Sequence, residues 1–89
     1  MTITVAIVED LDEVREGLVK FINNDPDFKV LDAFSNAEEA LISLPHLQPD
    51  IVIMDINLPG MNGIDLVALI HLQYPGLPCL MLSGNNEAE

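Results

Sequence analysis

Basic residues are scarce in this sequence. Its 89 residues include 3 lysines and arginines against 15 aspartates and glutamates, which gives a formal net charge of −12 at pH 7. Such an excess of negative charge repels the phosphates of nucleic acids and anionic membrane surfaces. We therefore expect neither nucleic acid nor membrane as a partner of this chain, whereas metal cations or a basic protein would suit its charge.

The sequence also has only one cysteine and no long apolar run. The single cysteine, Cys79, excludes a disulfide within the chain and a zinc site built from cysteines. It lies in the apolar run 79–82, which favours an inert buried thiol over a nucleophile. No apolar run approaches the length of a membrane span, and the N-terminus lacks the charged and apolar regions of a signal peptide. These absences predict a cytoplasmic protein.

The length of the chain predicts one small domain that covers residues 1–89. Hydrophobic residues make up 49% of the sequence, which is too many for a disordered chain. A chain this short buries only about two-thirds of the surface that it exposes when unfolded. Its core must therefore be efficient or shared with a partner.

Four short apolar runs, most of them rich in β-branched residues, predict β-strands. They cover residues 3–8, 28–33, 51–54 and 79–82. Helical spacing of apolar residues predicts helices between them, at about 12–22, 36–45 and 63–74. Strands that alternate with helices through short crossovers form a parallel sheet with helices on both faces. We therefore predict a doubly wound α/β fold, with strand order 2-1-3-4 and a crevice at the point where the order reverses.

Local signals predict where the helices begin and end. Asp12 is the expected N-cap of the first helix, and Asn36 and Asn62 are the expected N-caps of the second and third. Pro45 is expected to close the second helix, because proline cannot donate a backbone hydrogen bond. The third helix is apolar almost all round, which is typical of a helix buried on more than one side.

Three of the four predicted strands end in a residue with a functional side chain. Glu9 and Asp10 follow the first strand, Asp55 ends the third, and Ser83 follows the fourth. The carboxyl ends of parallel strands lie along one edge of a sheet, where ligands bind in open α/β folds. We therefore expect these side chains to converge despite their wide separation in the sequence.

A cluster of three carboxylates predicts both a metal ion and a reaction. Mutual repulsion raises at least one pKa in the cluster unless a cation binds. Mg²⁺ suits a site of carboxylates, a backbone carbonyl and waters that leaves a position for a phosphate oxygen. Asp55 beside such an ion could attack a phosphoryl group and form an acyl phosphate, with the Ser83 hydroxyl donating to a phosphoryl oxygen.

Four segments carry a resemblance to a known family. They are VAIVED at residues 5–10, PDIVIMD at 49–55, LPGMNG at 58–63 and LSG at 82–84. In this order and at this spacing they resemble the receiver domain of bacterial two-component response regulators. The resemblance covers nearly all of the chain and implies a flavodoxin-like receiver fold.

The resemblance also implies a role for each residue at the strand ends. Asp55 would be the phosphoacceptor, receiving a phosphoryl group from a histidine of a sensor kinase or phosphotransfer protein, or from a small phosphodonor. Mg²⁺ would be bound by Asp10, Asp55 and the backbone carbonyl of Asn57, with Glu9 acting through water. Ser83 would contact the phosphoryl group. Such a protein accepts phosphate in a phosphorelay rather than turning over a substrate as an enzyme.

A complete receiver continues through a helix, a strand and a further helix, and carries a lysine after that strand. This sequence ends at Glu89, and its basic residues Arg15, Lys20 and Lys29 do not match the lysine. We therefore expect a receiver fold that lacks the last helix-strand-helix unit, with impaired phosphotransfer. The strand at 79–82 would then be an exposed edge, which predicts a homodimer joined through that strand.

Two alternative functions remain. One is a phosphotransfer-inactive receiver fold that acts through dimerisation or interaction. The other is a metal-dependent phosphohydrolase, although Asn57 stands where phosphatases of the haloacid dehalogenase type need a second acid. Taken singly, Glu9 and Asp10 are also typical of a helix cap, and Asp55 of an Asx-turn.

Overall fold

A computed structural model describes residues 1–82 of the chain. In this part the elements, in chain order, are β1 (Ile3–Val8), α1 (Asp12–Asn23), β2 (Phe28–Phe34), α2 (Ala37–Leu47), β3 (Ile51–Asp55), α3 (Gly63–Gln73) and β4 (Cys79–Leu82). The strands form one parallel sheet in the order β2-β1-β3-β4. The predicted α/β class and strand order are therefore confirmed, and no strand beyond β4 is present in the described part.

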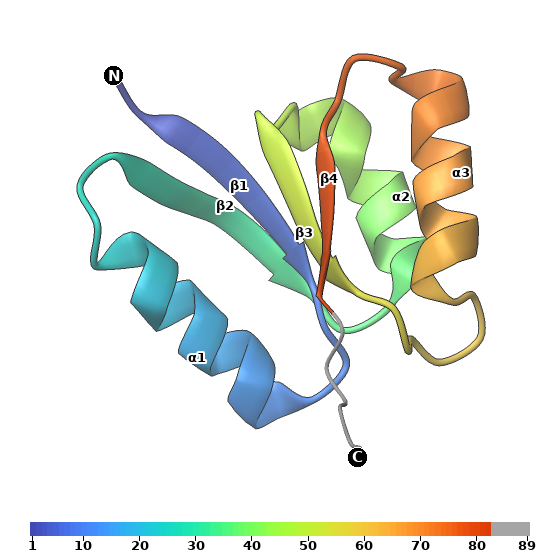
Figure 1. Cartoon of the computed structure of the whole chain (residues 1–89), viewed down its shortest axis with the longest axis horizontal. Coiled ribbons are helices and arrows are strands. Elements are labelled where there is room, and N and C mark those ends of the chain that lie inside the picture. Colours follow the sequence, from blue (N-terminus) through green and yellow to red (C-terminus); the bar gives the residue numbers. More distant parts are fainter. Residues whose placement is uncertain (83–89) are drawn as a thin grey trace.

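Helices cover both faces of the sheet. Figure 1 shows α1 on one face and α2 and α3 side by side on the other, as right-handed crossovers between parallel strands require. The central strand β1 is the most deeply buried, and Val5, Ala6, Ile7 and Val8 are each at most 1% exposed. Burial on both faces explains why this strand has no polar alternation. None of the described helices has the length and apolar character needed to cross a membrane.

The main core lies between the sheet and the two helices α2 and α3. Its most completely buried members include Val52 and Met54 from β3, Leu44 from α2, and Leu66 and Ile70 from α3, each at most 2% exposed. These side chains hold α2 and α3 against β3. The core therefore fixes the strand that ends in Asp55.

The opposite face of the sheet is less completely covered. No residue of α1 is buried, and Phe21 on this helix is 79% exposed. An apolar groove of about 690 Å³ lies between α1 and the sheet, lined by Phe21, Val5, Ile51, Ile53 and Leu80 among others. The strand β4 is an edge of the sheet in the described part of the chain.

Helices α1 and α2 depart from their predicted ends. The N-cap of α1 is Leu11 rather than Asp12. Asp12 is the first helical residue, and its carboxylate accepts a hydrogen bond from the Arg15 guanidinium instead of capping the helix. Helix α2 continues through Pro45 to Leu47. Pro45 lacks only its own backbone N–H, and because just two helical residues follow it, this loss falls at the end of the helix.

The predicted caps of α2 and α3 are confirmed. Asn36 and Asn62 each accept a hydrogen bond from the backbone N–H three residues further on, at 2.9 Å. The predicted burial of α3 on more than one side is wrong, because Ile64 and Leu72 are 60% and 80% exposed. This helix packs with one side toward the sheet and α2, and its other side has no neighbour in the described part.

Candidate functional site

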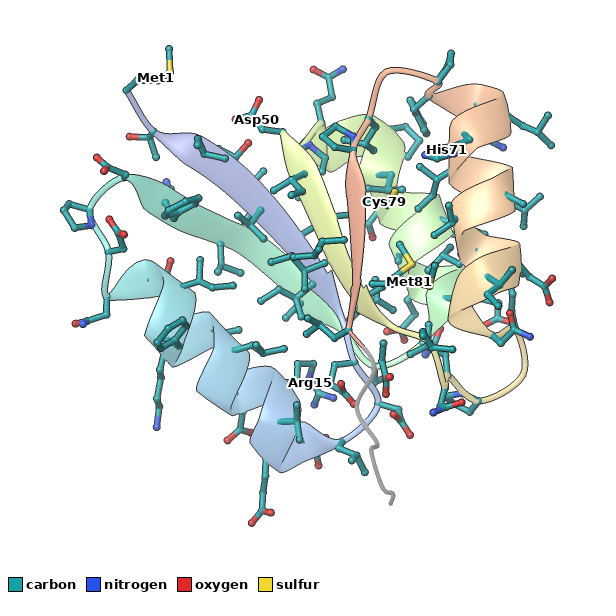
Figure 2. All side chains as sticks on the ribbon, viewed as in Figure 1. Met1, Arg15, Asp50, His71, Cys79 and Met81 are labelled. Carbon is teal, nitrogen blue, oxygen red and sulfur yellow. The ribbon has the colours of Figure 1, made fainter. Side chains whose placement is uncertain are left out.

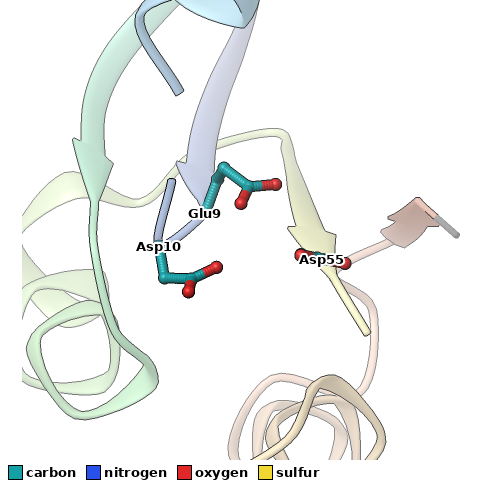
Figure 3. Close-up of side chains that lie close together, drawn as sticks. All are labelled: Glu9, Asp10 and Asp55. Atoms are coloured by element: carbon teal, nitrogen blue, oxygen red, sulfur yellow. The ribbon is translucent and has the colours of Figure 1, made fainter. Parts of the chain in front are cut away.

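The acidic residues at the ends of β1 and β3 lie side by side. The two strands pair in parallel with Val8 opposite Met54, so the next residues, Glu9 and Asp55, reach the same edge of the sheet. Asp10 follows on the loop toward α1. One carboxylate oxygen from each of the three acids lies within 4.8 Å of the other two. Figure 3 shows the three side chains gathered at this edge of the sheet. The predicted convergence of these side chains is confirmed.

Two of the three carboxylates are largely removed from water. Glu9 is 4% exposed and Asp55 is 7% exposed, whereas Asp10 is half-buried. Burial raises the pKa of the Glu9 carboxyl above its ordinary value, and the nearby Asp55 and Asp10 raise it further. The N–H of Leu11, 3.1 Å from Oε2 of Glu9, opposes this shift. The metal-free cluster is therefore electrostatically unfavourable, and a cation would relieve it.

The loop from β3 to α3 holds Asp55 in place. The backbone N–H of Asn57 donates to Oδ1 of Asp55 at 3.2 Å, and the N–H of Gly63 donates to the carbonyl of Ile56 at 2.7 Å. A Cβ on Gly63 would lie 2.9 Å from the Cα of Ile56 and would overlap the Asp55 carbonyl oxygen. The start of α3 can therefore approach the end of β3 this closely only because residue 63 is glycine.

Sequence reasoning does not assign Arg15 to this site, yet its guanidinium contacts the turn that carries Glu9 and Asp10. Its Nη1 donates to the backbone carbonyl of Glu9 at 2.9 Å, and its Nη2 pairs with the Asp12 carboxylate at 2.5 Å. Figure 2 shows Arg15 near the end of β1. The available signal is a cation in the first turn of the helix after an acidic strand end, in a chain with only 3 basic residues.

Of the remaining predicted site residues, Asn57 belongs to the described part of the chain and Ser83 does not. Asn57 lies two residues beyond Asp55, on the loop that leads from the same edge of the sheet to α3. Ser83 lies outside the described residues, so its contact with a phosphoryl group stays a prediction.

The Cys79 thiol is partly buried, and burial raises its pKa. Its Sγ donates to the carbonyl of Leu77 at 3.7 Å. This agrees with the expected unreactive thiol.

The donor atoms of the acidic cluster fit a hard divalent cation. All three side chains offer carboxylate oxygens, which lie close enough to share one ion. Mg²⁺ prefers oxygen ligands and is commonly bound by one or two carboxylates while it keeps several waters or phosphate oxygens. The chemistry of these donors therefore suits Mg²⁺ better than zinc, for which proteins mainly use cysteine and histidine.

A family model for the response regulator receiver domain matches residues 5–89. This chain belongs to that family. Receivers are the signal-accepting parts of two-component regulatory systems, and they generally bind Mg²⁺ in an acidic pocket. In this receiver the acidic group consists of Glu9, Asp10 and Asp55.

Individual relatives agree with the family match. The chain is 38% identical over 85 residues to a protein-glutamate methylesterase/protein-glutamine glutaminase of Nitrosospira multiformis, covering 96% of this chain and 24% of that protein. It is 33% identical over 87 residues to the DNA-binding transcriptional activator DevR/DosR of Mycobacterium tuberculosis, covering 98% and 40%. The isolated REC domain of RcsB from Salmonella enterica serovar Typhimurium, solved with the phosphomimetic BeF₃⁻, matches with a TM-score of 0.89 at 27% identity, covering 98% and 65%.

The chain spans 24% and 40% of the lengths of the two curated relatives. Their names describe different activities, ester hydrolysis in one and DNA binding in the other, although both share the region that matches this chain. The common part is the receiver. The receiver role in two-component signal transduction is therefore what this chain shares with them.

Proposed function

We propose that this receiver accepts a phosphoryl group on Asp55 with the help of Mg²⁺. The donor is a histidine of a sensor kinase or phosphotransfer protein, or a small phosphodonor such as acetyl phosphate. The observation that carries the proposal is the convergence of carboxylate oxygens from Glu9, Asp10 and Asp55 within 4.8 Å at the carboxyl edge of the sheet. Family membership supports it, because receivers act in phosphorelays. The related REC domain of RcsB was solved with a phosphomimetic.

The proposed reaction is a transfer between two nucleophiles. A carboxylate oxygen of Asp55 attacks the phosphorus atom, and the new O–P bond forms as the P–N bond to the donor histidine breaks. The electron pair of the broken bond leaves with the imidazole. With acetyl phosphate a P–O bond breaks instead, and acetate leaves. The product in both cases is an acyl phosphate on Asp55.

The surrounding residues hold Asp55 and the ion. Asp10, Asp55 and the backbone carbonyl of Asn57 would bind Mg²⁺, with Glu9 acting through water. Bound Mg²⁺ supplies positive charge that allows a phosphoryl group to approach an acidic pocket. The Asn57 N–H, 3.2 Å from Oδ1 of Asp55, restricts rotation of that carboxylate and so orients it. The Ser83 hydroxyl would donate to a phosphoryl oxygen.

Incubation with Mg²⁺ and acetyl phosphate, followed by intact-mass measurement, tests this proposal. The wild-type chain should gain the mass of one phosphoryl group, and Asp55→Asn should gain none. Asp27→Asn is a matched control, because Asp27 is exposed and its side chain accepts no hydrogen bond in the described structure. Absence of the gain in wild type would contradict the proposal. Steady hydrolysis of simple phosphomonoesters would instead favour a phosphohydrolase.

A specific observation favours a second candidate function, an interaction module that works by self-association. Within residues 1–82, β4 pairs with β3 on one side and has no strand on the other. Leu80 on this strand is 50% exposed and also lines the apolar groove. Such an open edge is a template for pairing with another chain. We propose a two-fold homodimer in which the β4 strands of two copies pair.

Sedimentation or light scattering at micromolar concentration tests the homodimer. Wild type should sediment as a dimer and Leu80→Lys as a monomer, because a lysine at the interface would be desolvated or expelled. Leu72→Lys is the control, since Leu72 is 80% exposed and belongs to α3 rather than to the edge strand β4. A monomeric wild type would contradict the proposal. A dimer that gains no phosphoryl mass would identify the interaction module, whereas a dimer that gains it supports both candidates.

A further inference from the structure

Glu9 and Asp10 are joined by one peptide bond whose carbonyl oxygen belongs to Glu9. A peptide unit is planar, so its orientation sets the directions in which the two adjoining side chains leave the backbone. The Arg15 guanidinium donates to this carbonyl oxygen through Nη1 at 2.9 Å. The geometry points to Arg15 as a positioning residue, which orients the Glu9–Asp10 peptide so that both carboxylates face Asp55. Its predicted effect on metal affinity rests on the proposed Mg²⁺ site.

Two further hydrogen bonds hold the turn from β1 to α1 beside this contact. The N–H of Leu11 donates to Oε2 of Glu9 at 3.1 Å, and the N–H of Arg15 donates to the carbonyl of Leu11 at 2.8 Å. Helix α1 has no side-chain cap at Leu11. The turn is therefore held from inside the helix, by Arg15, where other helices use a capping side chain.

The other terminal nitrogen of the Arg15 guanidinium, Nη2, also has a partner. Nη2 pairs with Asp12 at 2.5 Å, and the Arg15 side chain is only 18% exposed. A planar guanidinium that binds two acceptors at once has little freedom to rotate. Arg15 therefore contacts the peptide in one fixed geometry, which a flexible surface cation would not do.

Two roles of Arg15, as a nearby positive charge and as a positioning group, predict opposite effects of its removal on Mg²⁺ affinity. A positive charge near a cation site repels the cation, so a purely electrostatic role predicts tighter Mg²⁺ binding when the charge is removed. Loss of a group that orients metal-binding side chains instead lowers metal affinity, typically by about 10- to 100-fold. The sign of the change in affinity therefore distinguishes the two roles.

Mg²⁺ titration of the whole chain by calorimetry, below the melting temperature, measures this sign. We expect Arg15→Ala to weaken binding by about tenfold or more. Arg15→Lys should recover only part of the loss, because an ammonium group cannot bridge the Glu9 carbonyl and Asp12 in the same fixed geometry. Lys20→Ala is the matched control, since Lys20 is an exposed cation on the same helix. Arg15→Ala binding as tight as wild type, or tighter, would overturn the inference.

Amide hydrogen exchange without metal tests Arg15 independently of the Mg²⁺ site. The Leu11 amide should exchange about tenfold faster in Arg15→Ala and in Arg15→Lys, because the turn that it closes is released. The core amide of Val52 and the Lys20→Ala variant should not change. Unchanged Leu11 exchange would overturn the inference even if Mg²⁺ binds. Failure of wild type to bind Mg²⁺ would refute the proposed metal site, and the exchange data would still decide the role of Arg15.

Discussion

Gly63 lies directly against the backbone of Asp55, the residue that we propose as phosphoacceptor. A Cβ at residue 63 would overlap the Asp55 carbonyl oxygen and lie 2.9 Å from the Cα of Ile56. The N–H of Gly63 donates to the Ile56 carbonyl at 2.7 Å, so the first residue of α3 is hydrogen-bonded to the residue that directly follows β3. The position of Asp55 therefore depends on a contact between two backbones that only glycine allows.

Substitution of Gly63 by alanine should destabilise the fold by about 1–3 kcal/mol, as overpacking of a close contact does. It should also slow phosphorylation by acetyl phosphate, because α3 must move away from Asp55. Gly17→Ala is a control within α1, where an added Cβ meets no atom within 4 Å. That substitution should stabilise the protein by about 0.5–1 kcal/mol. Urea unfolding measures the change in stability of each variant, and the time course of the phosphoryl mass gain measures the rate for Gly63→Ala. Equal stability of the two variants would contradict the prediction.

Mg²⁺ should raise the melting temperature, because it binds the folded acidic cluster and not the dispersed acids of the unfolded chain. At a concentration of 100 times the dissociation constant the stabilisation is about 2.7 kcal/mol, which corresponds to roughly 10 °C or more for a domain of this size. Asp10→Asn should abolish most of the shift, whereas Asp27→Asn should keep it. Scanning calorimetry with and without EDTA checks this. An unchanged wild-type melting temperature in millimolar Mg²⁺ would argue against the site.

The pH dependence of stability should reveal the unfavourable burial of Glu9. Its pKa is raised in the folded state above the ordinary value of 4.5. Between these two pKa values the folded state binds more protons than the unfolded state, so metal-free stability falls as pH rises through this range. Glu9→Gln should remove this loss and be more stable than wild type at neutral pH. Urea midpoints across pH in EDTA measure the difference, and parallel curves for the two proteins would contradict the prediction.

Asp50 should show the opposite pH dependence. Hydrogen bonds from the Thr4 N–H at 2.8 Å and the Thr4 hydroxyl at 3.0 Å lower the pKa of the Asp50 carboxyl. Its contribution is present above the ordinary pKa of 3.8 and is lost as pH falls through the lower folded value. Asp50→Asn should therefore melt at a lower temperature than wild type at neutral pH and approach it in acid. Asp27→Asn serves as control, and a constant difference across pH would refute this.

Much of the fold follows from information that is local in the sequence. The bounds predicted for β1 and β4 agree with the structure. The caps at Asn36 and Asn62 are also confirmed, because a capping side chain and the N–H that it accepts from are only three residues apart. The predicted end of α2 at Pro45 is wrong, because a proline signals that a helix will end but not how many residues follow before it does.

The sequence by itself determined that acids follow two apolar strands, and the rule for parallel sheets was enough to expect them at one edge. The tertiary structure decided the register that sets Val8 opposite Met54 and so brings Glu9 beside Asp55. It also decided that Arg15 binds the backbone of Glu9 and that α3 buries only one side. Such contacts depend on how separate elements pack in space, whereas sequence patterns report mainly the preferences of each element alone.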